Sequence, residues 1–69
     1  MQAQQAHKQT ASSVRERRIA AGMTQRELAI AADCSLPSVA NLEAGVLPRR
    51  SEVVPRILDA LAAAEREAL

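Results

Sequence analysis

Apolar residues recur at helical spacing in the middle of the chain, between Gln25 and Leu42. They are Leu28, Ala29, Ala32, Cys34, Val39 and Leu42. This spacing buries one stripe of each of two short helices and leaves the start of the second helix exposed. Because only a short bend separates the two helices, they must cross steeply. The pattern therefore predicts a helix-turn-helix.

Capping residues predict where the first three helices begin. Ser13 with Glu16, and Thr24 with Glu27, have the spacing of a capping box, in which each side chain bonds the other residue's amide. Ser35 can cap the third helix in the same position, before a proline that fits the first turn. We therefore expect helices to start at Ser13, after Thr24 and after Ser35.

Three residues predict where these helices end. Gly22 and Gly45 follow the first and third helices and readily adopt the left-handed backbone conformation that stops a helix. Asp33 lies at the bend after the second helix, where aspartate tolerates that conformation at modest cost. The first helix is thus expected to run to about Ala21.

Residues 1–11 contain no strong apolar residue after Met1. They have nothing to bury, so we expect a mobile N-terminal arm over residues 1–11 and a helix-turn-helix domain over residues 12–69. The predicted fold class is all-α, a small bundle of four or five helices.

The last predicted helix starts after a loop at Ser51 and has an apolar stripe at Val54, Ile57, Leu58 and Leu61. A chain of 69 residues is too short to form a large hydrophobic core, so its stability should be marginal unless a partner adds buried surface. The stripe is more than one small core needs, so a homodimer contact here is expected. The candidates are Leu58, Leu61 and Leu69.

Composition excludes several classes of protein. The chain has no Phe, Tyr or Trp, which counts against modules that stack single-stranded bases on aromatic rings. One Cys and one His form no metal-ligand cluster, and Cys34 falls in an apolar pattern typical of a buried residue. No set of catalytic side chains is visible, so we expect neither an enzyme nor a cofactor. No apolar run is long enough for a membrane span or a signal peptide, which predicts a cytoplasmic protein.

Charge is divided unevenly along the chain. Up to Arg50 there are seven basic and four acidic residues, whereas two basic and four acidic residues follow. A basic front and an acidic back suit a protein that meets a polyanion with one side, although ordinary solvated charges also produce such a split.

From Val14 to Leu61 the chain resembles the helix-turn-helix domain of lambdoid phage repressors and Cro proteins, the Xre family. The matching residues are Arg18, Gly22, Met23, Thr24, Gln25, Leu28, Ala29, Ser35, Val39, Leu42, Glu43, Gly45, Ile57, Leu58 and Leu61. The resemblance implies a lambda-repressor-like fold and binding to double-stranded DNA.

The resemblance also implies roles for polar residues. Arg18 shares an inward helical face with Val14 and Ala21, and in the family its counterpart pairs with the residue matching Glu43. The alternative is a solvated arginine. Gln25 matches a phosphate-binding glutamine, although it could equally be a surface helix former. The predicted phosphate or minor-groove contacts are Thr24, Gln25, Arg26, Ser35, Arg49 and Arg50.

Base contacts would come from the first turns of the third helix. The candidates are Leu36, Pro37, Ser38, Ala40 and Asn41. Leu36 and Pro37 depart from the usual polar pattern and can only pack on thymine methyl groups, whereas Asn41 can bond adenine. Few residues on this surface can therefore recognise bases by hydrogen bonding. Either DNA shape supplies much of the specificity, through Arg49 or Arg50 in the minor groove, or this surface does not bind DNA.

Two functions follow from this pattern. The first is a sequence-specific transcriptional regulator, a repressor that binds an inverted repeat as a homodimer. The second is a protein-interaction module of the same fold, such as an antitoxin-like partner, whose Leu36, Pro37, Val46 and Leu47 contact another protein.

Overall fold

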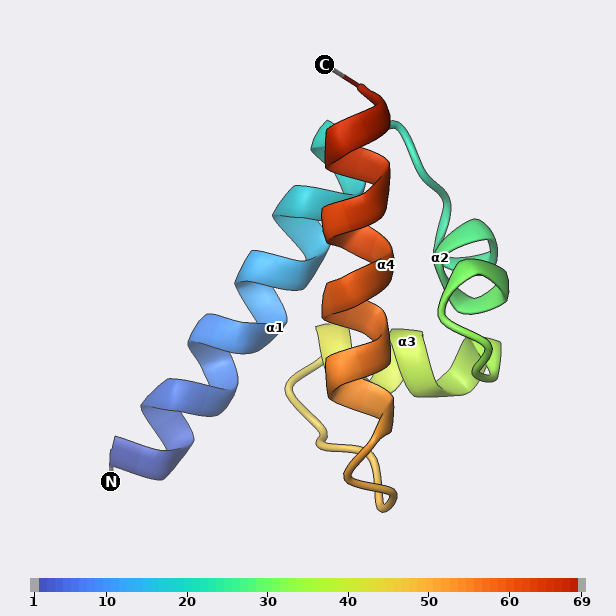
Figure 1. Ribbon diagram of the computed structural model, residues 1–69. Helices are drawn as coiled ribbons and strands as arrows, with labels where there is room; N and C mark the ends of the chain where they lie inside the picture. The colour runs from blue at the N-terminus through green and yellow to red at the C-terminus, as the bar shows by residue number, and fades with distance from the viewer. Residues whose placement is uncertain (1, 69) are drawn as a thin grey trace.

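Four helices account for the regular structure in the computed structural model, which describes the backbone of residues 2–68 and the side chains of residues 11–68. They are α1 (Gln2–Ala20), α2 (Gln25–Ala31), α3 (Leu36–Glu43) and α4 (Val53–Glu67). α1 and α4 diverge toward the N-terminus of α1, and α3 passes behind the lower half of α4 (Figure 1). The predicted all-α bundle is confirmed, with four helices in the described part of the chain.

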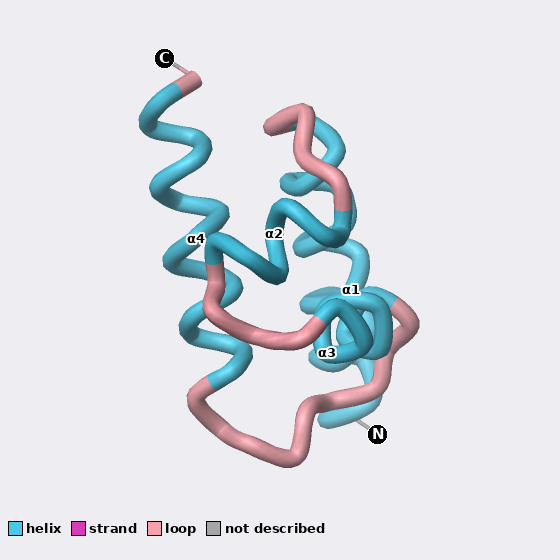
Figure 2. The backbone as a smooth tube through the Cα atoms, turned by 90° about the vertical axis from the view of Figure 1, so that its right-hand side faces the viewer, coloured by secondary structure: helices cyan, strands magenta, loops and turns pink. Residues whose placement is uncertain are grey.

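The steep crossing of α2 and α3 is visible when two views are compared. α3 runs across the view in Figure 1 and is seen nearly end-on in Figure 2, whereas α2 shows the opposite change. Thr24 caps α2 with a complete capping box, and Ser35 caps α3 by accepting a hydrogen bond from the Ser38 amide. The predicted starts of both helices are therefore confirmed.

The first three helices end in the same motif. Gly22, Asp33 and Gly45 have positive φ angles of 72°, 54° and 93°. In each case the next amide bonds a carbonyl five residues back. These bonds join Met23 N to Arg18 O (3.0 Å), Cys34 N to Ala29 O (3.0 Å) and Val46 N to Asn41 O (2.8 Å). This is the Schellman arrangement, which satisfies carbonyls at the helix end and turns the chain sharply. The predicted helix ends are confirmed.

The prediction that a helix starts at Ser13 was wrong, because α1 is continuous from Gln2. Ser13 lies inside the helix and has no cap to form. The Gln and Ala residues before it are good helix formers and extend a helix that the packed part of the chain has already nucleated. The division into an arm over residues 1–11 and a domain over 12–69 stays a prediction.

The start of α4 also differs from the expectation. Ser51 does not cap it, since the residue before the helix is Glu52, which already has helical φ and ψ angles and makes no side-chain cap bond. The chain enters α4 through a turn in which the Val53 amide bonds the Arg50 carbonyl (3.3 Å). Pro55 is the third residue of α4, where its missing N–H leaves no intrahelical bond unmade.

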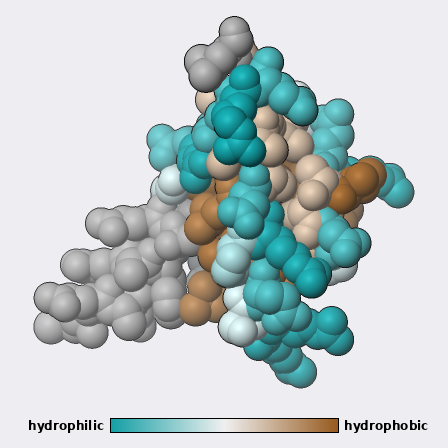
Figure 3. All heavy atoms as spheres, viewed as in Figure 1, coloured by the Kyte–Doolittle hydropathy of each residue, from teal (hydrophilic) through white to brown (hydrophobic). Residues whose placement is uncertain are grey.

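Apolar side chains from all four helices form one core. Its buried members are Val14, Leu28, Ala29, Ala32, Val39, Leu42, Val53, Ile57 and Leu61. Cys34, Val54 and Leu58 are only partly buried against it, and Val53 was missing from the predicted stripe. The outer face of α4 is mostly hydrophilic, with hydrophobic atoms along its side toward α1 (Figure 3). This packing fixes α3 with one face inward and the other outward.

Candidate nucleic-acid interface

α3 has a sharply divided surface. Val39 and Leu42 are 0% and 1% exposed, so they anchor the helix on the core. Leu36, Pro37 and Asn41 are exposed on the other side, and Ser38 and Ala40 are half-buried. The five predicted base contacts therefore all retain some accessible surface, the serine and the alanine less than the others.

Ser35 and Ser38, two of the predicted DNA contacts, form a hydrogen bond through their hydroxyl groups. The Ser35 and Ser38 hydroxyl oxygens lie 2.8 Å apart, and the Ser38 amide donates to the Ser35 hydroxyl at 3.2 Å. One of the two hydroxyls must use its proton in this pair. The pair thus offers one hydroxyl proton to an acceptor, and it holds the first turn of α3 in place.

The start of α2 places Thr24, Gln25 and Arg26 together. The Thr24 hydroxyl accepts from the Glu27 amide at 3.0 Å, and the Thr24 amide donates to the Glu27 carboxylate at 2.8 Å. Arg26 is exposed, whereas Gln25 is half-buried. Because the hydroxyl proton of Thr24 is not used in the capping box, it is available to an anion.

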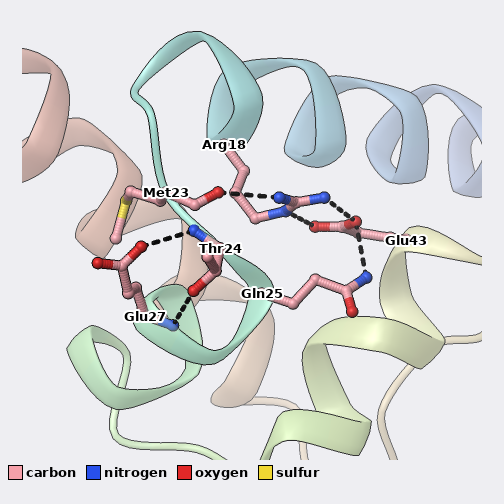
Figure 4. Close-up of polar contacts among 6 residues, drawn as sticks. All are labelled: Arg18, Met23, Thr24, Gln25, Glu27 and Glu43. Carbon is pink, nitrogen blue, oxygen red and sulfur yellow. Dashed lines mark hydrogen bonds and ion pairs between the residues drawn. The ribbon is translucent and has the colours of Figure 1, made fainter.

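Arg18 and Glu43 form a bidentate ion pair between α1 and α3 (Figure 4). The Arg18 Nε donates to Oε2 at 2.6 Å, and Nη2 donates to Oε1 at 3.0 Å. The remaining nitrogen, Nη1, donates to the Met23 carbonyl at 2.9 Å. The side chains of Arg18 and Glu43 are only 12% and 5% exposed. The inward arginine thus has a partner for each guanidinium nitrogen, and α1 is tied to the end of α3.

Electrostatics at Glu43 favour the charged carboxylate. Desolvation on burial raises its pKa, but hydrogen bonds from Arg18 and Gln25, with the positive charges of Arg18 and Arg15, outweigh this and hold the pKa below its ordinary value. The hydrogen bond to Glu43 likewise raises the pKa of Arg18. Both groups are therefore ionised at neutral pH.

Gln25 lies in an arrangement that the sequence did not indicate. Its Nε2 donates to Glu43 Oε1 at 3.1 Å, so the carboxamide points from α2 toward the ion pair (Figure 4). One N–H of the amide group is used by this bond, and the other remains for an acceptor outside. The carboxylate thus accepts from α1 and α2 at once.

The loop between α3 and α4 carries Arg49 and Arg50, both exposed. Loop residues Val46 to Arg50 line a hollow of about 400 Å³ together with Ser38, Asn41 and Val53. The structure therefore places the two loop arginines beside the outer face of α3, next to the predicted base contact at Asn41.

Of the three residues predicted to form the dimer contact, the two that the structure describes differ in how far they are exposed. Leu61 is 0% exposed in the core of its own chain, so its prediction as a dimer contact needs correction: it has no surface to offer. Leu58 is half-buried, and Leu69 lies outside the described residues. The C-terminal part of α4 is instead tied to α1 by Arg17, whose guanidinium bonds both carboxylate oxygens of Glu65 at 2.8 and 2.7 Å.

Other chemistry is sparse in the described part of the chain. Cys34 is half-buried, and desolvation raises the pKa of its thiol, so the reactive thiolate is disfavoured. No group of three His, Cys, Asp or Glu side chains among the described residues could hold a metal ion. None of the helices described is long and apolar enough to cross a membrane.

Comparison with known proteins agrees with this geometry. A family model described as a helix-turn-helix domain matches residues 11–69, which is most of the chain. No curated protein and no solved structure matches the sequence. The match covers the crossed pair α2 and α3, the second half of α1 and the whole of α4, and the chain therefore belongs to the helix-turn-helix domain family.

Proposed function

We propose that the chain is a sequence-specific DNA-binding transcriptional regulator of the lambdoid repressor and Cro type. The observation that carries this proposal is the division of α3, whose inner residues Val39 and Leu42 are buried while Leu36 and Asn41 are exposed. A short helix held in this way can enter the major groove with its first turns against the bases.

Base readout is assigned to the outer face of α3. Asn41 is exposed and can bond the N6 and N7 atoms of adenine in a bidentate manner. Leu36 and Pro37 are exposed and apolar, which suits contact with thymine methyl groups. Ser38 and Ala40 present smaller surfaces between them. We therefore expect a binding site rich in A·T pairs at the contacted positions.

Phosphate contacts are assigned to both sides of α3. Thr24, Gln25 and Arg26 lie at the start of α2, and Arg49 and Arg50 lie in the loop after α3. Such contacts fix the register of the protein on the duplex and make its affinity depend on salt. The loop arginines can also enter a narrow minor groove, where the negative potential is enhanced.

We further propose that the protein represses transcription as a homodimer in the cytoplasm. The small core contains only Ala, Val, Leu and Ile side chains, so it would gain stability from surface buried against a second copy. A two-fold dimer would bind an inverted repeat with half-sites about one helical turn apart. Leu58 and the C-terminal end of the chain are the proposed contact.

The test combines selection from a random DNA library with a salt series on the selected duplex. We expect log K to fall linearly with log salt concentration, by about 0.9 for each neutralised phosphate. Replacing both loop arginines, Arg49→Ala with Arg50→Ala, should reduce that slope by about two such steps for each bound subunit. Absence of DNA affinity at low salt would contradict the proposal.

One observation favours a second function, a protein-interaction module. Leu36, Val46 and Leu47 are 43%, 55% and 44% exposed, which is a large apolar surface for so small a chain. An antitoxin-like partner would use these residues against another protein. In that case the salt series shows no DNA binding, which separates the two functions.

A further inference from the structure

A polar hollow of about 290 Å³ lies where α1, α2 and α3 meet. Its walls are Arg15, Arg18, Gln25, Ala40, Glu43 and Ala44. Ala40 is on α3 and Ala44 is the residue that follows this helix, and their small side chains keep the hollow open. Ala40 is also one of the proposed base contacts, so the hollow lies beside the surface that would face DNA.

Two charges in this hollow cancel each other. Arg18 spends its three guanidinium nitrogens on Glu43 and on the Met23 carbonyl, and both carboxylate oxygens of Glu43 accept bonds. Three of the five N–H groups of Arg18 are bonded in this way, and the pair as a whole has no net charge. The remaining charge of the hollow is therefore that of Arg15.

Arg15 is exposed on α1. Among the side chains of residues 11–68, no carboxylate lies within ion-pair distance of it. Its charge nevertheless acts on Glu43 across the hollow, where it helps to hold the pKa of that carboxylate low. An arginine that lines a hollow without forming an ion pair there is available to an anion.

Gln25 supplies a second donor to the same hollow. Its bond to Glu43 fixes the direction of the carboxamide and leaves one N–H for an acceptor. A guanidinium and an amide N–H, with one net positive charge, match the single negative charge and the two free oxygens of a phosphodiester. A phosphate monoester or a carboxylate is less suited, because the hollow is continuous with the face that would follow a DNA strand.

We propose that Arg15 and Gln25 together bind one phosphate of the DNA backbone in this hollow. This rests on the proposed function and extends the DNA contact surface to the first helix, at a residue to which the sequence pattern gave no role. Glu43 is then a positioning residue, since it holds Gln25 in the orientation that the phosphate needs.

The test measures the salt dependence of binding to a fluorescein-labelled duplex selected from the random library. For each bound subunit, Arg15→Ala should weaken binding roughly tenfold at low salt and reduce the slope of log K against log salt by about 0.9. Arg15→Lys keeps the charge and should keep the slope. Arg56→Ala is the matched control, because Arg56 is also exposed but lies on α4 and does not line the hollow.

Several outcomes overturn the proposal. If Arg15→Ala and Arg56→Ala change the slope equally, the effect is one of net charge and no phosphate lies in the hollow. If Arg15→Ala lowers the free energy of unfolding by as much as it lowers the free energy of DNA binding, Arg15 has a structural role. If the wild-type protein binds no duplex, the proposed function itself fails, which is distinguishable from wild-type binding that Arg15→Ala leaves intact.

A second measurement uses duplexes in which single phosphates are replaced by neutral methylphosphonates. One position should weaken binding by the wild-type protein more than binding by Arg15→Ala, because the variant has already lost the Arg15 contact at that phosphate and keeps only the Gln25 contact. If every position weakens both proteins by the same factor, Arg15 contacts no particular phosphate and the proposal is wrong.

Discussion

Glu43→Ala should destabilise the domain far more than an ordinary surface substitution. The change removes the acceptor of three hydrogen bonds, two from Arg18 and one from Gln25. The Arg18 guanidinium would remain, with its side chain only 12% exposed and with the Met23 carbonyl as its described acceptor. A buried charge without its partner is the main source of the cost.

The magnitude follows from this burial. Breaking a buried pair by removing one partner costs about 3–5 kcal/mol. For a domain of this size, each kcal/mol lowers the melting temperature by roughly 4–8 °C. We therefore expect a fall of at least about 12 °C, which is a large part of what so small a core can supply.

Thermal unfolding followed by circular dichroism at neutral pH measures this shift. Glu65→Ala is the matched control, because it breaks the other bidentate pair, in which Arg17 and Glu65 are 32% and 42% exposed. Exposed pairs contribute little, so the melting temperature of the control should hardly change. A fall of less than about 4 °C in Glu43→Ala would refute the reasoning. Replacing both partners with apolar residues, Arg18→Met with Glu43→Leu, should restore most of the stability.

Three further predictions concern pH, specificity and assembly. A carboxylate whose folded-state pKa is lowered stabilises the fold above its unfolded pKa, so the contribution of Glu43 should be complete above pH 4.5 and lost as pH falls below it. Melting curves across this range should show the loss, and Glu43→Gln should show less of it. Asn41→Ala should cost about 1–3 kcal/mol of binding to the selected duplex and relax the base preference at one position; an unchanged selection would exclude Asn41 as a reader. A chain ending at Ala62 should sediment with more monomer than the full chain, and an unchanged dimer would exclude residues 63–69 from the interface.

Local signals predicted the helix-turn-helix well. Thr24 and Ser35 cap their helices as expected, and Asp33 adopts the left-handed conformation at the bend. Each of these features depends on residues that are neighbours in the chain, so the local sequence is enough to predict it. Ser13 and Ser51 show the limit of this reasoning. Ser13 does not cap because the backbone before it is already helical, whereas Ser51 does not cap because a turn delays the start of α4 until Val53.

The polar contacts between helices were harder to predict. The pairing of Arg18 with Glu43 came from the resemblance to a known family, since the two residues are 25 positions apart. Gln25 joins that pair, and Arg17 bonds Glu65 across 48 positions. No periodic pattern in the sequence indicates either contact, because each depends on how two helices pack. The role of Arg15 beside the hollow became visible only with that packing.

The divided surface of α3 has a consequence for how such a protein can acquire new targets. Val39, Leu42 and Glu43 hold the helix, whereas Leu36, Pro37 and Asn41 are exposed and contribute little to the core. Exchanging the outward residues should therefore alter the preferred DNA sequence at almost no cost in folding free energy. A domain with only a few kcal/mol to spare can thus be redirected, by natural drift or by design, while its scaffold stays unchanged.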